Sequence, residues 1–157
     1  MKRSSLTWIV APAVALSLAF QSASQTPPAS PASEDQLTIH RNLGKAFYEN
    51  PTTHQQAVEE FQRALELAPD SVRERINYGL ALLRAGRPAQ GIAELQRAQQ
   101  QDASVPHTWF NLGIEFKKAG DSERAIAQFE QMVRLVPDEP ISHYNLGYLY
   151  RLTERIA

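Results

Sequence analysis

Four glycines recur along the chain at a nearly constant spacing, and this recurrence constrains the fold more than any other feature of the sequence. The glycines are Gly44, Gly79, Gly113 and Gly147, separated by 35, 34 and 34 residues. Two further series keep the 34-residue step, one of small side chains (Ala57, Gly91 and Ala125) and one of bulky side chains (Phe61, Leu95 and Phe129). A period of this length indicates a stack of similar supersecondary units.

Each unit is predicted to be a hairpin of two α-helices. In the third unit, apolar residues with helical spacing occur over 109–116 and again over 125–133, on either side of Gly120-Asp121. Small residues fit where the two helices approach closely, and the bulky series fills the space towards the next hairpin. Ser71 and Asp121 are predicted helix N-caps, and Pro69 and Pro137 are predicted to end second helices.

These residues resemble the tetratricopeptide repeat, whose pattern has Trp, Leu-Gly and Tyr in the first helix and Ala, Phe, Ala and Pro in the second. The third unit matches with Trp109, Leu112-Gly113, Phe116, Ala125, Phe129 and Pro137. The predicted units span 37–71, 72–105 and 106–139, with a partial fourth at 140–157; the first has one extra residue near Asn50-Pro51. The resemblance implies an all-α fold, a right-handed superhelical stack of antiparallel helical hairpins with about three and a half repeats.

The N-terminus has the layout of a secretory signal peptide over residues 1–24. Lys2 and Arg3 precede an apolar stretch from Leu6 to Phe20, and small residues follow at Ser22 and Ser24. The alternative is a membrane anchor, but roughly 15 apolar residues span only about 22 Å as a helix, short of a hydrocarbon core of about 30 Å. We therefore expect export, with cleavage near residue 24, and a mature chain that is periplasmic or secreted and does not span a membrane.

The segment 25–36 is rich in Pro, Ala and Ser and lacks apolar periodicity, which predicts a disordered linker before the repeat domain at 37–157. The sequence contains no cysteine, which excludes thiolate metal sites, thiol nucleophiles and a lipoprotein anchor. A formal net charge of -1 makes nucleic acid an unfavoured partner, because that affinity depends on a surplus of Lys and Arg.

No arrangement of residues in the sequence indicates catalysis. The four histidines are His40, His54, His107 and His143, and none lies three or four residues from another. No phosphate-binding loop, nucleophile elbow or carboxylate pair is present, so we expect no enzyme activity, no metal and no cofactor. The acidic residues of the second helices, Glu59, Glu60, Glu66, Glu94, Glu123 and Glu130, are expected on a solvated outer face.

The resemblance also implies a binding groove, because the first helices of such repeats line the concave wall. Counting positions within each unit gives these candidate partner-binding residues: Arg41, Asn42, Lys45, Arg73, Asn77, Arg84, His107, Asn111, Lys117, Lys118, Tyr144, Asn145, Tyr148 and Arg151. The same positions include Tyr48 and the apolar residues Ile76, Leu80, Leu83, Phe110 and Ile114.

The charges and amides at these positions favour an extended, partly acidic peptide or protein segment as the partner. Seven Lys or Arg residues stand against one acid, and an asparagine occupies the same place in every unit. Arg and Lys attract carboxylates, and an amide can pair with a peptide backbone. The alternative is that asparagine belongs to the repeat pattern and that the charges only solvate the surface. The carboxylate clamp of chaperone-binding relatives is incomplete here, because Lys45 stands where that clamp has asparagine, and His107 and Asn111 replace its basic pair.

The fourth unit stops at Ala157, before its second helix. We expect Leu146, Leu149 and Tyr150 to be left exposed, and self-association through this uncapped helix. The runs 108–113 and 142–147 also resemble the N-terminal parts of exported proteins with FG-GAP and ASPIC/UnbV domains. The main hypothesis is a non-catalytic scaffold for protein–protein interaction. The alternative is an N-terminal accessory domain of a larger exported enzyme or envelope assembly factor.

Overall fold

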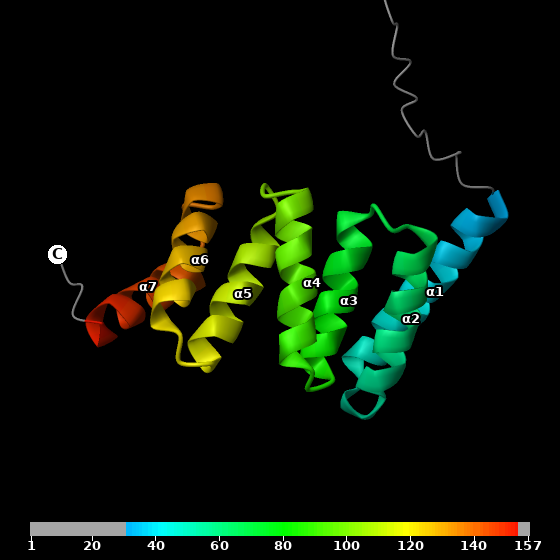
Figure 1. The fold of residues 1–157 in the computed structure, drawn as a ribbon, viewed down its shortest axis with the longest axis horizontal. Coiled ribbons are helices and arrows are strands. Elements are labelled where there is room, and N and C mark those ends of the chain that lie inside the picture. The colour runs from blue at the N-terminus through cyan, green and yellow to red at the C-terminus, as the bar shows by residue number, and fades with distance from the viewer. Residues whose placement is uncertain (1–30, 154–157) are drawn as a thin grey trace, which may run out of the picture.

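The computed structural model describes residues 31–153, and this part of the chain forms seven α-helices and one short 3-10 helix (Figure 1). The elements are α1 (Pro31–Glu49), η1 (Pro51–Thr53), α2 (His54–Leu67), α3 (Val72–Arg84), α4 (Pro88–Gln101), α5 (Pro106–Lys118), α6 (Ser122–Leu135) and α7 (Pro140–Leu152). Helices α1 and α2, α3 and α4, and α5 and α6 pair as hairpins, and each hairpin packs on the next. The predicted all-α stack of helical hairpins is confirmed.

Glycine closes the turns of the second and third hairpins. Gly86 has φ of 74° and Gly120 has φ of 76°, the left-handed backbone conformation that favours glycine. At each turn two amides bond back to the end of the first helix: Gly86 N to Leu83 O (3.2 Å) and Arg87 N to Leu82 O (2.9 Å) in the second hairpin. The first hairpin turns through Asn50 and η1 instead, which accommodates the extra residue seen in the sequence.

Side chains cap three of the helices, α3, α6 and α7. Ser71 Oγ accepts a hydrogen bond from Glu74 N (3.3 Å), and Asp121 Oδ1 accepts one from Arg124 N (3.0 Å). Both predicted N-caps are therefore confirmed. The sequence analysis missed a third, Glu139, whose carboxylate accepts from the first-turn amides of α7.

Helix α1 begins at Pro31, six residues before the expected domain boundary at Leu37. Residues 31–36, assigned to the linker, instead form its first turns. Ala32, Glu34 and Asp35 are exposed, so this segment needs no apolar periodicity, and the acidic Glu34 in the first turn favours a helix N-terminus. The expected signal peptide and the rest of the linker, residues 1–30, lie outside the described residues.

Three of the four repeated glycines lie where the two helices of a hairpin approach closely, as expected. A Cβ atom added to Gly44 would stand 2.7 Å from the Phe61 ring, and one added to Gly113 would stand 2.9 Å from the Phe129 ring. In the second hairpin, Gly79 faces the side chain of Leu95 and the backbone of Gly91. Larger side chains at these positions would push the hairpins apart.

The core consists of two clusters of buried apolar side chains. The first contains Ala57, Val58, Phe61, Ala81 and Leu82. The second contains Leu95, Leu112, Phe116, Ala125, Ile126, Phe129, Leu146 and Leu149. The first cluster belongs to α2 and α3, and the second runs from α4 to α7.

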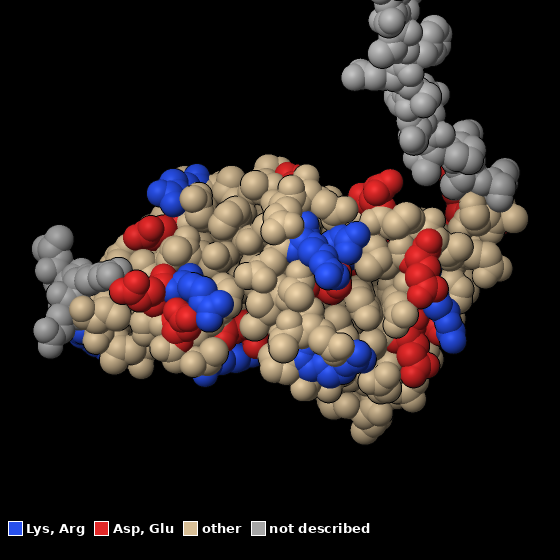
Figure 2. Space-filling model, viewed as in Figure 1, with Lys and Arg blue, Asp and Glu red and all other residues tan. Residues whose placement is uncertain are grey.

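The expectation that the acids of the second helices all lie on a solvated face is wrong for Glu60 and Glu94, each 8% exposed. Glu60 pairs with His40 of its own hairpin at 2.6 Å, and Glu94 pairs with Arg75 at 3.0 Å. In the view of Figure 2, Lys and Arg lie beside Asp and Glu and do not form separate patches. None of the helices in the described part of the chain is long and apolar enough to cross a membrane.

Candidate binding groove

Three adjoining hollows lie on the first helices and meet at Leu80, and together we call them the groove. The central hollow, about 370 Å³, is lined by Tyr48, Leu80, Leu83, Arg84, Phe110, Asn111, Ile114, Glu115 and Lys118. The Arg73 hollow, about 350 Å³, is lined by Val72, Arg73, Ile76, Asn77, Leu80, Val105 and His107. The Lys45 hollow, about 270 Å³, is lined by Lys45, Tyr48, Glu49, Phe61, Asn77 and Leu80.

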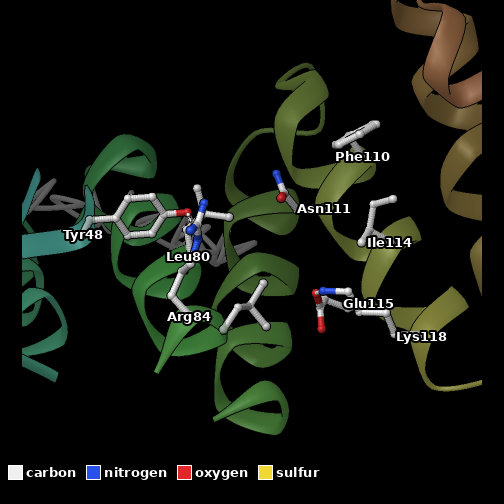
Figure 3. A pocket seen from close by; sticks show the side chains of 9 residues that line it. Tyr48, Leu80, Arg84, Phe110, Asn111, Ile114, Glu115 and Lys118 are labelled. Carbon is white, nitrogen blue, oxygen red and sulfur yellow. Dashed lines mark hydrogen bonds and ion pairs between the residues drawn. The ribbon is translucent and has the colours of Figure 1, made fainter. Parts of the chain in front are cut away.

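Helix α3 supplies the middle of the groove because one of its faces carries the lining residues. Arg73, Ile76, Asn77, Leu80 and Arg84 recur at intervals of three and four residues, which places them along one side of a helix. Helix α1 contributes from one flank and α5 from the other (Figure 3). Of the fourteen predicted residues, these hollows bring together seven: Lys45, Arg73, Asn77, Arg84, His107, Asn111 and Lys118.

Two of the basic residues in the central hollow already have partners. The Arg84 guanidinium lies over the Tyr48 ring, 4.7 Å from its centroid, and its Nε donates to the Tyr48 hydroxyl at 3.2 Å (Figure 3). Lys118 pairs with Glu115 at 2.7 Å. The sequence analysis missed Glu115 as a lining residue, so the central hollow is less basic than predicted.

Two other basic residues of the groove remain uncommitted. Lys45 and Arg73 are exposed, and neither has a hydrogen-bond or ion-pair partner among the described residues. Arg73 stands beside the most apolar part of the groove, formed by Val72, Ile76, Leu80 and Val105. Positive charge next to apolar surface is thus concentrated in the Arg73 hollow.

Arg41 belongs to the interior of the stack and is not a free groove residue. Its guanidinium pairs with Glu74 at 2.7 Å, and the Glu74 side chain is fully buried. Asn42, one residue further on, is exposed on α1 and lines none of the three hollows.

Lys117 and Asn145 likewise join neighbouring units. Lys117 Nζ donates to Asn145 Oδ1 at 2.6 Å and lies 4.8 Å from the centroid of the Tyr148 ring. Asn145 is 3% exposed, and its Nδ2 donates to Ile141 O at 2.8 Å. Both polar atoms of Asn145 are therefore used inside the chain, and at this position the structural role of the repeated asparagine holds.

The other asparagines differ in how much of the amide stays available. Asn111 Nδ2 donates to His107 O one turn earlier on α5 at 2.7 Å, and Asn77 Nδ2 donates to Glu74 at 3.4 Å. The Asn111 side-chain oxygen has no partner among the described residues and lines the central hollow. That oxygen can accept a backbone N–H from a bound segment.

The remaining candidates, Tyr144, Tyr148 and Arg151, lie apart from the groove. With His143 and Gly147 they line a hollow of about 250 Å³ on α7, which we call the Gly147 hollow. It shares no lining residue with the three hollows of the groove. These candidates of the fourth unit thus line a hollow of their own on α7.

The expectation that Leu146, Leu149 and Tyr150 face water is wrong. Leu146 is 8% exposed and Leu149 is 1% exposed, because both belong to the second core cluster, and the Tyr150 hydroxyl donates to Glu130 at 2.7 Å. The exposed apolar side chains of α7 are instead Ile141, Tyr144, Tyr148 and Leu152.

Within residues 31–153, no group of three or more His, Cys, Asp or Glu side chains is placed to hold a metal ion. A stack of helical hairpins with hollows along its first helices defines a helical-repeat protein with a groove. The chain belongs to the tetratricopeptide repeat family, whose model matches residues 53–106 and 110–157.

Solved structures with the same fold include three that frame the proposals below. The chain is 21% identical to MamA, with a TM-score of 0.68, and the match covers 76% of this chain and 65% of the MamA chain. It is 13% identical to the first tetratricopeptide domain of Spaghetti (RPAP3) bound to the HSP90 peptide SRMEEVD, with a TM-score of 0.70 and coverage of 76% and 97%. It is 20% identical to the Thermobaculum terrenum O-GlcNAc transferase, with a TM-score of 0.66 and coverage of 77% and 23%.

At these identities the likeness shows the fold alone. No curated protein sequence matches the chain. The chain spans about two thirds of MamA and about a quarter of the transferase.

Proposed function

We propose that this chain is a non-catalytic scaffold that binds an extended, partly acidic segment of another protein in the groove. The observation that carries the proposal is the Arg73 hollow. There an exposed arginine without an ion-pair partner among the described residues stands beside four apolar side chains: Val72, Ile76, Leu80 and Val105. The best-matched guest has an apolar side chain flanked by carboxylates.

Each part of such a guest has a counterpart in the groove. An apolar side chain of the guest would be buried against Ile76 and Leu80, and this removal of apolar surface from water favours binding. A carboxylate near Arg73 or Lys45 would form a charge-assisted hydrogen bond. A backbone N–H of the guest could donate to the free side-chain oxygen of Asn111.

The family and one structural neighbour support a protein partner, because the RPAP3 domain is solved with an acidic HSP90 peptide. The mode of binding proposed for this chain differs from a terminal carboxylate clamp. Arg41, which stands where such a clamp has a basic residue, is committed to buried Glu74. We therefore place the guest's acidic groups along the segment and not at its C-terminal carboxylate.

A charge reversal in the Arg73 hollow tests the proposal. Fluorescent peptides with one Leu or Ile between acidic residues would be titrated into the wild-type chain and the Arg73→Glu variant by anisotropy. Arg134→Glu is the matched control, because Arg134 is an exposed residue of α6 and the variant makes the same change of charge away from the groove. We expect Arg73→Glu to weaken binding by about tenfold or more and Arg134→Glu to leave it unchanged. Equal effects of the two variants would refute the groove as the binding site.

The alternative function is an N-terminal accessory domain of a larger exported enzyme or envelope assembly factor. It is supported by the transferase, of which this chain covers 23%. Sequencing the gene past codon 157 separates the alternatives. An in-frame continuation into a second domain would reassign the function to the whole protein, and a stop codon would exclude this alternative.

Export is a further part of the proposal and rests on the charged and apolar pattern of residues 1–24. The intact mass of the protein isolated from its native host is expected to correspond to a chain that starts near Gln25. A full-length chain that retains Met1 in the cytoplasmic fraction would exclude export.

A further inference from the structure

The repeated glycine of α7 differs from the other three in what covers it. Gly44, Gly79 and Gly113 are buried, and a Cβ added to them would stand 2.7, 3.1 and 2.9 Å from Phe61, Leu95 and Phe129 of the following helix. Gly147 is exposed, and a Cβ added there would meet nothing within 4 Å. The same surface that receives a bulky side chain in three hairpins is open on α7.

Two of the three covered hairpins also have a polar contact next to this glycine. In the first, His40 Nδ1 lies 2.6 Å from Glu60, which immediately precedes Phe61. In the second, Arg75 pairs at 3.0 Å with Glu94, which immediately precedes Leu95. His40 and Arg75 stand four residues before their glycines, and on α7 this position is occupied by His143, whose Nε2 lies 2.6 Å from Pro137 O.

The three covering helices share a short sequence pattern. Each has a small residue four positions before the bulky one, a branched residue next, and Glu or Gln directly before the bulky residue. The segments are 57–61 (AVEEF), 91–95 (GIAEL) and 125–129 (AIAQF). This pattern describes the chemistry that the open surface of α7 matches.

The Gly147 hollow also carries a positive charge, that of Arg151. Its lining includes His143 and Arg151 and no acidic residue. Tyr144 and Tyr148 form its apolar walls, and Tyr144 is 71% exposed. A carboxylate carried beside a bulky apolar side chain is complementary to this combination.

We propose that the Gly147 hollow docks an amphipathic α-helix of another polypeptide, antiparallel to α7, with a Phe or Leu over Gly147 and the preceding Glu or Gln beside His143. The docked helix continues the series of hairpin interfaces that α2, α4 and α6 make on the preceding helices. This surface is distinct from the groove, because the two share no lining residue.

A peptide with the sequence of residues 53–68, which carries Glu60 and Phe61, is the probe. A free helix of this length is marginal in water, so binding should be accompanied by a gain of helical circular dichroism. We expect it to bind the full chain, with amide chemical-shift changes concentrated in α7. Replacing Phe61 by Ala in the peptide should weaken binding by more than about tenfold.

Gly147→Leu in the full chain is the decisive variant, since a Cβ added at Gly147 meets nothing within 4 Å and the larger side chain would occupy the hollow. Ala127→Leu is the matched control, because Ala127 is an exposed residue of α6 and the variant adds a leucine away from the hollow. The proposal requires that Gly147→Leu abolish binding and that Ala127→Leu leave it intact.

A second version places the peptide after Ala157 on a Gly/Ser linker, which raises its effective concentration to about the millimolar range. Amide exchange in α7 should then slow relative to a fusion in which the phenylalanine is Ala. The proposal is overturned if neither the free nor the fused peptide acts on α7, or if Gly147→Leu binds as well as the wild-type chain. It is also overturned if sedimentation shows that a second copy of the chain occupies the hollow in place of the peptide.

Discussion

Arg41 and Glu74 join the first hairpin to the second through a pair that is buried on the acidic side. Arg41 Nε and Nη2 lie 2.8 and 2.7 Å from the same carboxylate oxygen of Glu74. The equivalent positions of the next two units hold Thr108 and Ser142, which are also fully buried but uncharged. The charged pair is therefore particular to this junction.

Arg41→Ala is expected to destabilise the chain by about 3 kcal/mol, because it leaves the buried Glu74 carboxylate without its countercharge. We take the low end of the usual range since 19% of the Arg41 side chain is exposed and water can reach the site. Urea unfolding measures the change. Adding Glu74→Thr, the residue type found at 108, should restore most of the loss; a double variant as unstable as the single one would contradict this account.

Two glycine substitutions are expected to change stability in opposite directions. Gly113→Ala should destabilise by about 1–3 kcal/mol, because the new methyl group would stand 2.9 Å from the Phe129 ring. Gly147→Ala should stabilise by about 0.5–1 kcal/mol, since it meets no neighbour and removes a flexible residue from a helix. Thermal unfolding of both variants tests the pair of signs, and destabilisation of similar size in both would argue against an open surface at Gly147.

Lys117→Met is expected to destabilise α7 by about 1–2 kcal/mol. The change removes a charge-assisted hydrogen bond to buried Asn145 and a cation–π contact with Tyr148. Lys118→Met is the control, because its exposed pair with Glu115 contributes well under about 1 kcal/mol. Denaturant unfolding that gave equal losses for the two variants would remove the structural role of Lys117.

This role also affects the choice of variants for binding studies. Charge reversal of Lys117 together with Arg84 would weaken capture of an acidic partner, but it would also disturb contacts inside the stack. Arg73→Glu probes the groove more cleanly, because Arg73 has no partner among the described residues.

Acid should weaken the start of α6 through Asp121. The backbone N–H of Arg124, followed by its side chain, lowers the pKa of the Asp121 carboxyl. A lowered folded-state pKa gives stability that is present above the unfolded-state pKa and lost as pH falls through the folded-state value. Asp121→Asn should therefore be less stable than wild type at neutral pH, and the difference should shrink below about pH 4. Unfolding measured at pH 7 and pH 3 tests this, and a difference that stays constant would contradict it.

Amide exchange is expected to be faster in α7 than in α3 to α6. Helix α7 packs mainly on α6, whereas the inner helices have neighbours on both sides. In stacked repeats, stability is close to a sum of unit and neighbour contributions, so a helix that lacks one interface opens more often. Mass spectrometry of deuterium uptake measures this, and uniform protection from α3 to α7 would show that α7 is a stable end of the stack.

The repeat period predicted the hairpins because the glycine contacts lie within one unit and recur in the first three units. Groove positions such as Leu80 and Arg73 were predictable for the same reason, since they depend only on the face of a single helix. The pairing of Arg41 with Glu74 was not, because it depends on which residue the next unit happens to present. Glu115 was missed because its position lies outside the expected groove face. It lies on the same helix as Lys118 and neutralises its charge.

The error at α7 has a simple physical origin. Leu146 precedes the repeated glycine by one residue, as Leu112 does, and both side chains are buried. This position packs against the preceding unit, whereas in the first three units the glycine faces the second helix of its own hairpin. The exposed surface of α7 could have been located by applying the contacts of Leu112 and Gly113 to the fourth unit.

The division of the core into two clusters gives the groove a mechanical role. Tyr48 packs on the first cluster, whereas Leu83, Phe110 and Ile114 pack on the second, and all four line the central hollow. A segment bound there would contact residues that pack on both clusters and would connect the two. The free chain should then melt in two overlapping steps, and an occupied groove should merge them into one, so that the bound partner sets how much of the stack unfolds as a unit.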